Sequence, residues 1–257
     1  LGLPGMLKTF ALRGRELPLT LYGPRGLEEL FQSLRRIVGR LTFELAVVEL
    51  SAETILPRDG YSLRTFPARH GRDAIGYALV EETRPGRFDV ETADALGVPP
   101  GRERGALQRG EQVTLADGRV ITPEHVLGEA RPGRKIVLTG DTAPSDLVVE
   151  AAFGADLLVH EATFCEDEAE RARETEHSTA LEAARVALDA QVRLLALTHT
   201  SSRYGGGDVE REARTVFPNT VVPRDFDLIE VPFPERGAPE LQKRGARLPR
   251  AEVPSVP

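Results

Sequence analysis

Cysteine is almost missing from this sequence. Cys165 is the single cysteine in 257 residues, so no disulfide bond can form within the chain. Proteins without disulfides are typical of reducing compartments, and we therefore expect a cytoplasmic location. We interpret Cys165, which stands beside Phe164, as a small buried apolar residue rather than a catalytic thiol.

Long hydrophobic runs are also missing. No stretch approaches the ~18 apolar residues of a membrane span and no signal peptide is visible, so we expect no association with a membrane. The sequence contains no glycine-rich phosphate-binding loop and no internal repeat. Its net charge of −7 argues against broad electrostatic wrapping of nucleic acid, although a local basic patch would still permit an RNA partner.

Three short apolar runs stand out in the segment 135–204, over residues 136–138, 157–159 and 194–197. Each run is too short for a helix and is bounded by turn or helical sequence, so each is predicted to be a buried strand. Reactive side chains follow the runs, namely Asp141, His160 with Glu161, and His199. Because strand ends in α/β proteins meet at one rim, we expect a functional site there.

Helical patterns separate these strands. Ser145 is predicted to cap a helix that ends near Phe153, and Ser178 or Thr179 is predicted to cap a second helix with one apolar face. An order of strand, helix and strand implies right-handed crossovers and neighbouring, parallel strands. The chain is therefore predicted to have a layered α/β fold.

Further elements are predicted on both sides of this segment. We expect strands over 17–22, 43–50, 61–67, 74–80, 220–222 and 228–231, helices over 27–34 and 208–217, and a hairpin around Asp117-Gly118. The composition of residues 232–257, rich in proline and charge, predicts a disordered tail. Its basic patch consists of Lys243, Arg244, Arg247 and Arg250.

The segment 83–109 differs in composition from its surroundings. It has few large apolar residues, so we expect a protruding insertion that does not pack well by itself. Its arginines are interleaved with acidic residues and comprise Arg84, Arg87, Arg102, Arg104 and Arg109. A solvated loop and a phosphate-contacting element are both compatible with this pattern.

The residues at the strand ends suit metal chemistry. Aspartate and neutral histidine bind zinc and similar ions, and one carboxylate can bridge two ions. Asp141 would suit the bridging position, while His70, in a polar loop, and His199 would each bind one ion. Two ions ~3.5–4 Å apart can bind a phosphodiester and lower the pKa of a bridging water. The alternative is that each of these residues is only a hydrogen-bonded structural residue.

The other histidines are expected to have different roles. His177 precedes a helix start, where the helix dipole suits proton transfer only if a carboxylate restores the basicity of the imidazole. Glu161 is the candidate carboxylate. His160 points to the opposite side of the same strand, so only one of these two neighbours faces the site. His125 is interpreted as a surface residue.

Four motifs resemble those of the ribonuclease Z family, the tRNA 3′-end endonucleases of the metallo-β-lactamase superfamily. In chain order they are Gly140-Asp141-Thr142, the HEATF run at 160–164, the HST run at 177–179 and the LTHTSSRY run at 197–204. Residues Gly2–Gly5 also resemble the turn that follows the family's first metal motif. The resemblance therefore covers nearly all of the chain except the tail.

The resemblance implies a metallo-β-lactamase αβ/βα sandwich over residues 1–231, with two zinc ions between its sheets. It implies that His70 binds one zinc, Asp141 both, and His199 the other. It also assigns Glu161 and His177 to a proton relay that helps the leaving oxygen depart. Weaker candidates for substrate contacts are Ser178, Thr179, Ser201, Arg203 and Arg87.

The insertion around Pro85–Gly101 resembles the family's flexible arm. That arm clamps the elbow of tRNA, usually from the partner subunit of a homodimer. The resemblance thus implies precursor tRNA and a second copy of the chain as partners, and it favours a phosphate-contacting role for the insertion over a solvated loop.

One family motif has no counterpart in the sequence. The H-x-H-x-D-H motif, which supplies further metal ligands, would lie just before Leu1, so we expect a chain truncated at its N-terminus. With about two protein ligands per zinc, this polypeptide is predicted to bind zinc weakly and to cleave nothing by itself. Two alternatives stay open. One is a different hydrolase of the same fold, such as a small phosphodiesterase or an arylsulfatase, and the other is a non-catalytic tRNA-binding remnant.

Overall fold

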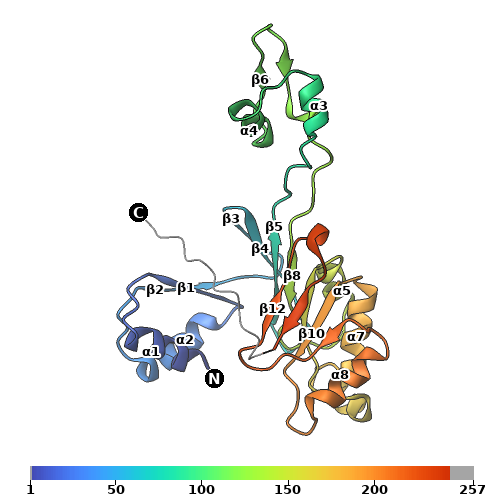
Figure 1. Ribbon diagram of the computed structural model, residues 1–257. Coiled ribbons are helices and arrows are strands. Elements are labelled where there is room, and N and C mark those ends of the chain that lie inside the picture. The colour runs from blue at the N-terminus through green and yellow to red at the C-terminus, as the bar shows by residue number, and fades with distance from the viewer. Residues whose placement is uncertain (1, 244–257) are drawn as a thin grey trace.

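A seven-stranded sheet forms the centre of the computed structural model, which describes residues 2–243 (Figure 1). Across the sheet the strand order is β11-β10-β9-β8-β5-β4-β3. The bounds are β3 Ile55–Arg58, β4 Tyr61–Pro67, β5 Ile75–Glu81, β8 Lys135–Leu138, β9 Leu157–Glu161, β10 Leu194–Thr198 and β11 Thr220–Val221. Strands β8 to β11 run parallel, whereas β3, β4 and β5 form an antiparallel meander that joins β8. The predicted α/β fold with parallel central strands is confirmed.

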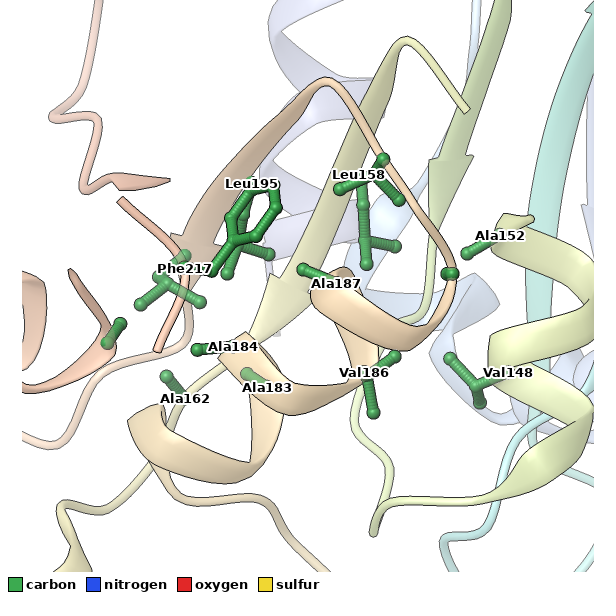
Figure 2. Packing of buried hydrophobic residues seen from close by; sticks show 14 of the residues in the cluster. Val148, Ala152, Leu158, Ala162, Ala183, Ala184, Val186, Ala187, Leu195 and Phe217 are labelled. Carbon is green, nitrogen blue, oxygen red and sulfur yellow. The ribbon is translucent and has the colours of Figure 1, made fainter. Parts of the chain in front are cut away.

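Three helices, of which α7 is rich in alanine, cover one face of this sheet. They are α5 Asp146–Ala152, α7 Ala180–Asp189 and α8 Gly206–Arg214. Figure 2 shows α7 lying over the strands that carry Leu158 and Leu195. Three side chains of α7, Ala183, Ala184 and Ala187, are fully buried. Because these side chains are small, the helix can approach the sheet closely, and the main core forms between them.

The opposite face of the sheet is covered by the segment that follows β11. Strand β12 Leu228–Glu230 pairs antiparallel with β13 Glu240–Gln242, and its Ile229 packs on buried Leu157 and Leu194. Residues 232–243 therefore do not form the disordered tail that the composition predicted, because β13 pairs with an apolar strand and η3 Pro234–Arg236 packs nearby. Residues 244–257, with three of the four basic tail residues, lie outside the described residues.

The N-terminal part forms a separate layer of two helices and a small sheet. Its elements are α1 Gly2–Leu12, β1 Leu19–Gly23, α2 Leu27–Val38 and β2 Leu45–Glu49, and β1 and β2 pair in parallel. The predicted turn at Gly2–Gly5 is wrong, because these residues begin a helix whose Leu7 is fully buried against Val38 and Phe43. The longest described helix, α2, has 12 residues, and no described helix is both long and apolar enough to cross a membrane.

The insertion between β5 and β8 projects from the body as a folded arm on a two-stranded stalk (Figure 1). The arm contains α3 Val90–Ala95, α4 Arg102–Gln108, β6 Val113–Thr114, β7 Val120–Ile121 and η1 Pro123–His125. It has its own core of buried residues, Ala93, Val98, Leu107, Ile121 and Val126. The expectation that the insertion does not pack is therefore wrong, because the apolar residues after position 109 complete the core that the predicted range 83–109 leaves unfinished.

The stalk of the arm is held by contacts between its two strands. Bridges pair Arg84 with Arg131 and Phe88 with Leu127. At Gly86 a β-carbon would lie 1.9 Å from the carbonyl oxygen of Gly128, so only glycine permits this approach. Glycine is often a sign of flexibility, but here it allows the two segments of the stalk to lie side by side.

Candidate metal centre

The carboxylate of Glu161 lies at the C-terminal end of β9 and is fully buried. Its Oε1 accepts hydrogen bonds from the amide of Thr142 at 2.9 Å and from Nδ1 of His177 at 2.7 Å. Its Oε2 accepts from the amide of Thr163 at 3.1 Å and from the hydroxyl of Thr163 at 2.7 Å. Four donors thus satisfy a carboxylate that would otherwise be costly to bury.

His160 shares the strand with Glu161 but points away from it. Its side chain is fully buried, its Nδ1 donates to the carbonyl oxygen of Glu161 at 2.7 Å, and its Nε2 has no hydrogen-bond partner among residues 2–243. Burial lowers the pKa of His160, so the ring is held neutral. As the alternation along the strand predicted, only Glu161 faces the site.

His70 is positioned by a contact between two loops. Its Nδ1 lies 3.0 Å from the carbonyl oxygen of Glu176, and the amide of Gly71 donates to the carboxylate of Glu176 at 2.6 Å. Glu176 has a φ of 54°, in the left-handed region that few side chains adopt. This conformation lets both its backbone and its side chain hold the loop of His70 beside His177, whose ring centroid is 4.7 Å away.

Asp141 and His199 come from the ends of two parallel strands. Nδ1 of His199 lies 3.7 Å from Oδ1 of Asp141, and the two side chains are 49% and 39% exposed. His199 has a φ of 54°, which turns the chain sharply after β10. Its ring stacks on His177 with a centroid separation of 5.4 Å. The structure therefore brings together His70, Asp141, Glu161, His177 and His199, as the sequence predicted.

These side chains form two groups of potential metal ligands. His70, Asp141 and His177 offer ligand atoms within 4.8 Å of one another, and so do Glu161, His177 and His199. Two imidazoles and one carboxylate fit a catalytic zinc-type site, which uses three protein ligands and leaves one position open. Both groups need His177, so within residues 2–243 a full set of three exists for one ion, with two donors left for another.

The residues predicted to contact the substrate are in several cases buried or already paired. Ser178 and Thr179 are fully buried: Ser178 donates to the carbonyl oxygen of Thr142 at 2.6 Å, and Thr179 caps α7. They hold the chain together and are not available to a substrate. Arg203 is paired with Glu168 at 2.7 Å. Ser201 accepts a weak hydrogen bond of 3.4 Å from the amide of Arg203. Arg87 is exposed and lies on the stalk of the arm, between the bridges at Arg84 and Phe88.

The remaining titratable residues singled out in the sequence lie outside the centre. Cys165 is buried, and burial together with the nearby carboxylates of Glu212 and Asp167 raises its pKa to about 12, as expected for an inert thiol. His125 is exposed and accepts from the amide of Thr122 at 3.1 Å in a capping interaction. The interpretation of both residues from the sequence is confirmed.

Sequence reasoning gave no role to Thr163, although its hydroxyl contacts three of the site residues. The hydroxyl oxygen lies 2.7 Å from Glu161 Oε2, 2.7 Å from Nδ1 of His199 and 3.3 Å from Nδ1 of His177. The feature of the sequence that could have indicated this role is the position of Thr163 two residues after Glu161. This spacing places both side chains on the same side of an extended chain.

Known proteins align with this sequence over most of its length. It is 48% identical over 240 residues to ribonuclease Z of Gemmatimonas aurantiaca, and the match covers 91% of this chain and 76% of that protein. It is 51% identical over 205 residues to ribonuclease Z of Myxococcus xanthus, which covers 79% of this chain and 67% of the relative. The chain belongs to the ribonuclease Z family. No protein-family model matches it.

Solved structures agree with a ribonuclease Z fold. The short form of human tRNase Z matches with a TM-score of 0.58 at 24% identity, over 90% of this chain and 74% of that one. The metallo-β-lactamase fold protein YhfI of Bacillus subtilis matches with a TM-score of 0.55 at 19% identity, over 86% and 67%. At these identities the likeness concerns the fold, and the predicted metallo-β-lactamase fold is confirmed.

Proposed function

We propose that this chain is a metal-dependent endoribonuclease that removes the 3′ trailer from precursor tRNA. The observation that carries the proposal is the buried Glu161 carboxylate, which anchors His177 beside His70, Asp141 and His199. Such a cluster can bind a cation and transfer a proton at one place, as phosphodiester hydrolysis requires. Membership of the ribonuclease Z family supports the choice of RNA substrate.

Zinc is the proposed cation. Asp141 would hold it together with His70 and His199, since imidazole and carboxylate donors suit zinc. Asp141 and His70 belong to one group of ligand atoms within 4.8 Å of one another, and Nδ1 of His199 lies 3.7 Å from Oδ1 of Asp141. When bound, the ion would neutralise phosphate charge and lower the pKa of a water molecule. The family resemblance implies two ions, and a second ion would share ligands with the first.

His177 is assigned to proton transfer. Glu161 accepts from its Nδ1, so its Nε2 is the atom that can face a substrate. In the imidazolium form, Nε2 can donate its hydrogen to the oxygen that leaves the phosphorus, while the other hydrogen stays on Nδ1 and is donated to Glu161 in a hydrogen bond. Glu161 thus fixes the orientation of the ring.

The arm is proposed to contact the tRNA substrate away from the cleavage site. It projects from the body on a narrow stalk, which suits a contact with a distant part of a large substrate (Figure 1). A homodimer, in which the arm of one subunit serves the centre of the other, is part of the proposal and rests on the family resemblance alone. An activity on precursor tRNA also fits the cytoplasmic location expected from the single cysteine.

The test is cleavage of a 5′-labelled precursor tRNA by the full chain with zinc supplied in excess. A single cut after the discriminator base, absent in Asp141→Asn, would support the proposal, whereas the sequence predicts that these 257 residues by themselves cleave nothing. At stoichiometric zinc we expect no cleavage, because each group of three ligand atoms among residues 2–243 includes His177, which is assigned to proton transfer. The remaining donors would hold zinc weakly. The sequence-based expectation that these 257 residues cleave nothing is decided by the same experiment.

Two other outcomes would replace the proposal. Hydrolysis of bis(p-nitrophenyl) phosphate without cleavage of precursor tRNA would identify a small phosphodiesterase, and hydrolysis of an aryl sulfate alone would identify an arylsulfatase. Binding of precursor tRNA without any cleavage, even with excess zinc, would identify a non-catalytic tRNA-binding protein.

A further inference from the structure

Three imidazoles in the centre share one feature, a short contact between Nδ1 and an oxygen atom. The partner is the carbonyl oxygen of Glu176 for His70, at 3.0 Å, and the carboxylate of Glu161 for His177, at 2.7 Å. For His199 it is the hydroxyl oxygen of Thr163, at 2.7 Å. The first two partners are acceptors, whereas a hydroxyl can donate or accept. Whether Thr163 donates to His199 or accepts from it therefore depends on its other contacts.

The Thr163 hydroxyl donates its hydrogen to Glu161. Oε2 of Glu161 lies 2.7 Å from this hydroxyl and also accepts from the amide of Thr163, so the carboxylate acts as the acceptor. A hydroxyl has a single hydrogen, and once it is donated to Glu161 the oxygen can only accept. The hydrogen in the contact with His199 therefore belongs to Nδ1 of the imidazole.

We propose that Thr163 is a positioning residue that connects Glu161 to His199. Through its hydroxyl, one buried carboxylate orients two imidazoles, His177 directly and His199 indirectly. All three rings then carry the hydrogen on Nδ1 and present the lone pair of Nε2. The use of the lone pairs of His70 and His199 for a cation rests on the proposed function, in which His177 transfers a proton. The hydrogen assignment rests on the hydrogen bonds alone.

His199 needs such a connection more than the other two imidazoles. Its side chain is 49% exposed, against 14% for His177, and its own backbone is in the left-handed region. An exposed ring without a fixed partner would change its orientation and take the Nε2–H tautomer that histidine favours in water. The Thr163 hydroxyl removes that freedom before a cation binds, as hydrogen-bond partners of metal ligands generally do.

The direct test reads the imidazole tautomers by long-range 1H–15N correlation on the metal-free full chain at about pH 8, where neutral histidine predominates. The chain has five histidines, so His→Gln variants can assign every signal. We expect Nδ1–H for His70, His177 and His199. In Thr163→Val, which removes the hydroxyl but keeps the shape, His199 should change to Nε2–H while His70 stays unchanged, and Thr163→Ser should restore the wild-type pattern.

Two results would overturn the proposal. One is an Nε2–H tautomer for His199 in the wild-type chain, a measurement that needs no variant to fold. The other is an unchanged His199 signal in a folded Thr163→Val protein. Neither depends on RNA cleavage, so a failure of the proposed function would leave this test intact.

Metal affinity gives a second readout. Titration with Co2+, followed by its visible absorption, should show about 10–100-fold weaker binding for Thr163→Val and near wild-type binding for Thr163→Ser. The matched control is Thr175→Val, which removes another hydroxyl that donates to a backbone carbonyl at 2.8 Å but lies on a surface turn. Equal Co2+ affinity in Thr163→Val and Thr175→Val would contradict a positioning role.

Discussion

At the scale of single residues, the carboxylate of Glu161 holds several groups of the centre in place by accepting their hydrogen bonds. It is fully buried and accepts four hydrogen bonds, from Thr142, His177 and twice from Thr163. In Glu161→Gln an amide group with two hydrogens replaces one acceptor oxygen, so at least one donor loses its partner. We expect a loss of about 1–3 kcal/mol in the free energy of unfolding, measured by urea denaturation.

The control for this substitution is Glu170→Gln, the same chemical change at an exposed position on α6 Ala169–Glu174. It should change the free energy of unfolding by less than about 0.5 kcal/mol. Equal stability of the two variants would show that the carboxylate of Glu161 is not the acceptor for these donors.

At the scale of elements, helix α7 depends on its N-terminal cap. The hydroxyl of Thr179 accepts from the amide of Glu182 at 3.1 Å, and the carboxylate of Glu182 accepts from the amide of Thr179 at 2.9 Å. Thr179→Ala removes one of these bonds at the start of a helix that carries much of the core. We expect a loss of about 1 kcal/mol in unfolding free energy by thermal or urea denaturation.

Serine keeps the capping oxygen, so Thr179→Ser should recover most of that loss. The position also tests the original interpretation of Thr179 as a substrate contact. If Thr179→Ala kept wild-type stability but lost affinity for precursor tRNA, the cap would be unimportant and a direct contact would be required.

The arm is a second element with its own stability. Leu107 is fully buried in the arm core with Val98 and Ile121, which have no part in the main core. Leu107→Ala should therefore destabilise the arm by about 2–5 kcal/mol and leave the seven-stranded sheet unaffected. Hydrogen exchange followed by mass spectrometry should show faster exchange over residues 84–131 only.

The matched control is Val120→Ala, a truncation in the same arm at a side chain that is 48% exposed. It should leave exchange almost unchanged. Faster exchange in the central sheet of Leu107→Ala would contradict an arm that folds around a separate core.

At the scale of the whole molecule, the C-terminal segment fastens the base of the arm. Glu235 pairs with Arg84 at 2.9 Å and with Arg131 at 3.0 Å, one residue from each strand of the stalk. The guanidinium groups of Arg84 and Arg134 lie over the ring of Phe233 at 3.5 and 4.6 Å. The segment once expected to be disordered thus connects the arm to the body.

These contacts predict how the arm base responds to pH. Hydrogen bonds from Arg84 lower the pKa of Glu235 from 4.5 to about 2. A lowered carboxyl pKa means that the stabilisation is complete above about pH 4.5 and is lost as the pH falls through about 2. Exchange at the arm base, corrected for the intrinsic rate, should therefore be constant between about pH 5 and 8 and rise below that window.

Glu235→Gln should raise exchange at the two ends of the stalk at about pH 7 and remove this acid-dependent step. The control is Glu240→Gln, an exposed change in the neighbouring strand β13. If the two variants exchanged alike, the arm base would be held by its backbone bridges and not by Glu235.

Local patterns in the sequence accounted for much of the fold. The apolar runs before Asp141, His160 and His199 predicted three parallel strands, and Thr179 predicted the start of α7. These features depend on residues a few positions apart, so the sequence contains what decides them. The arm core and the pairing of β12 with β13 were missed, because their apolar residues are scattered and pair only across long loops.

The sequence by itself determined that Asp141, Glu161 and His199 meet, since the ends of neighbouring parallel strands lie at one edge of a sheet. His70 and His177 join them from a loop and from the segment before a helix. Only the tertiary structure decided what each of them does there. Whether a hydroxyl donates or accepts, and which nitrogen of an imidazole stays free, depends on distances of less than 3 Å between Glu161, Thr163 and His199. Glu161 and Thr163 stand at the end of β9 and His199 at the end of β10. The spacing of residues along the chain carries no information about the direction of a single hydrogen bond between them.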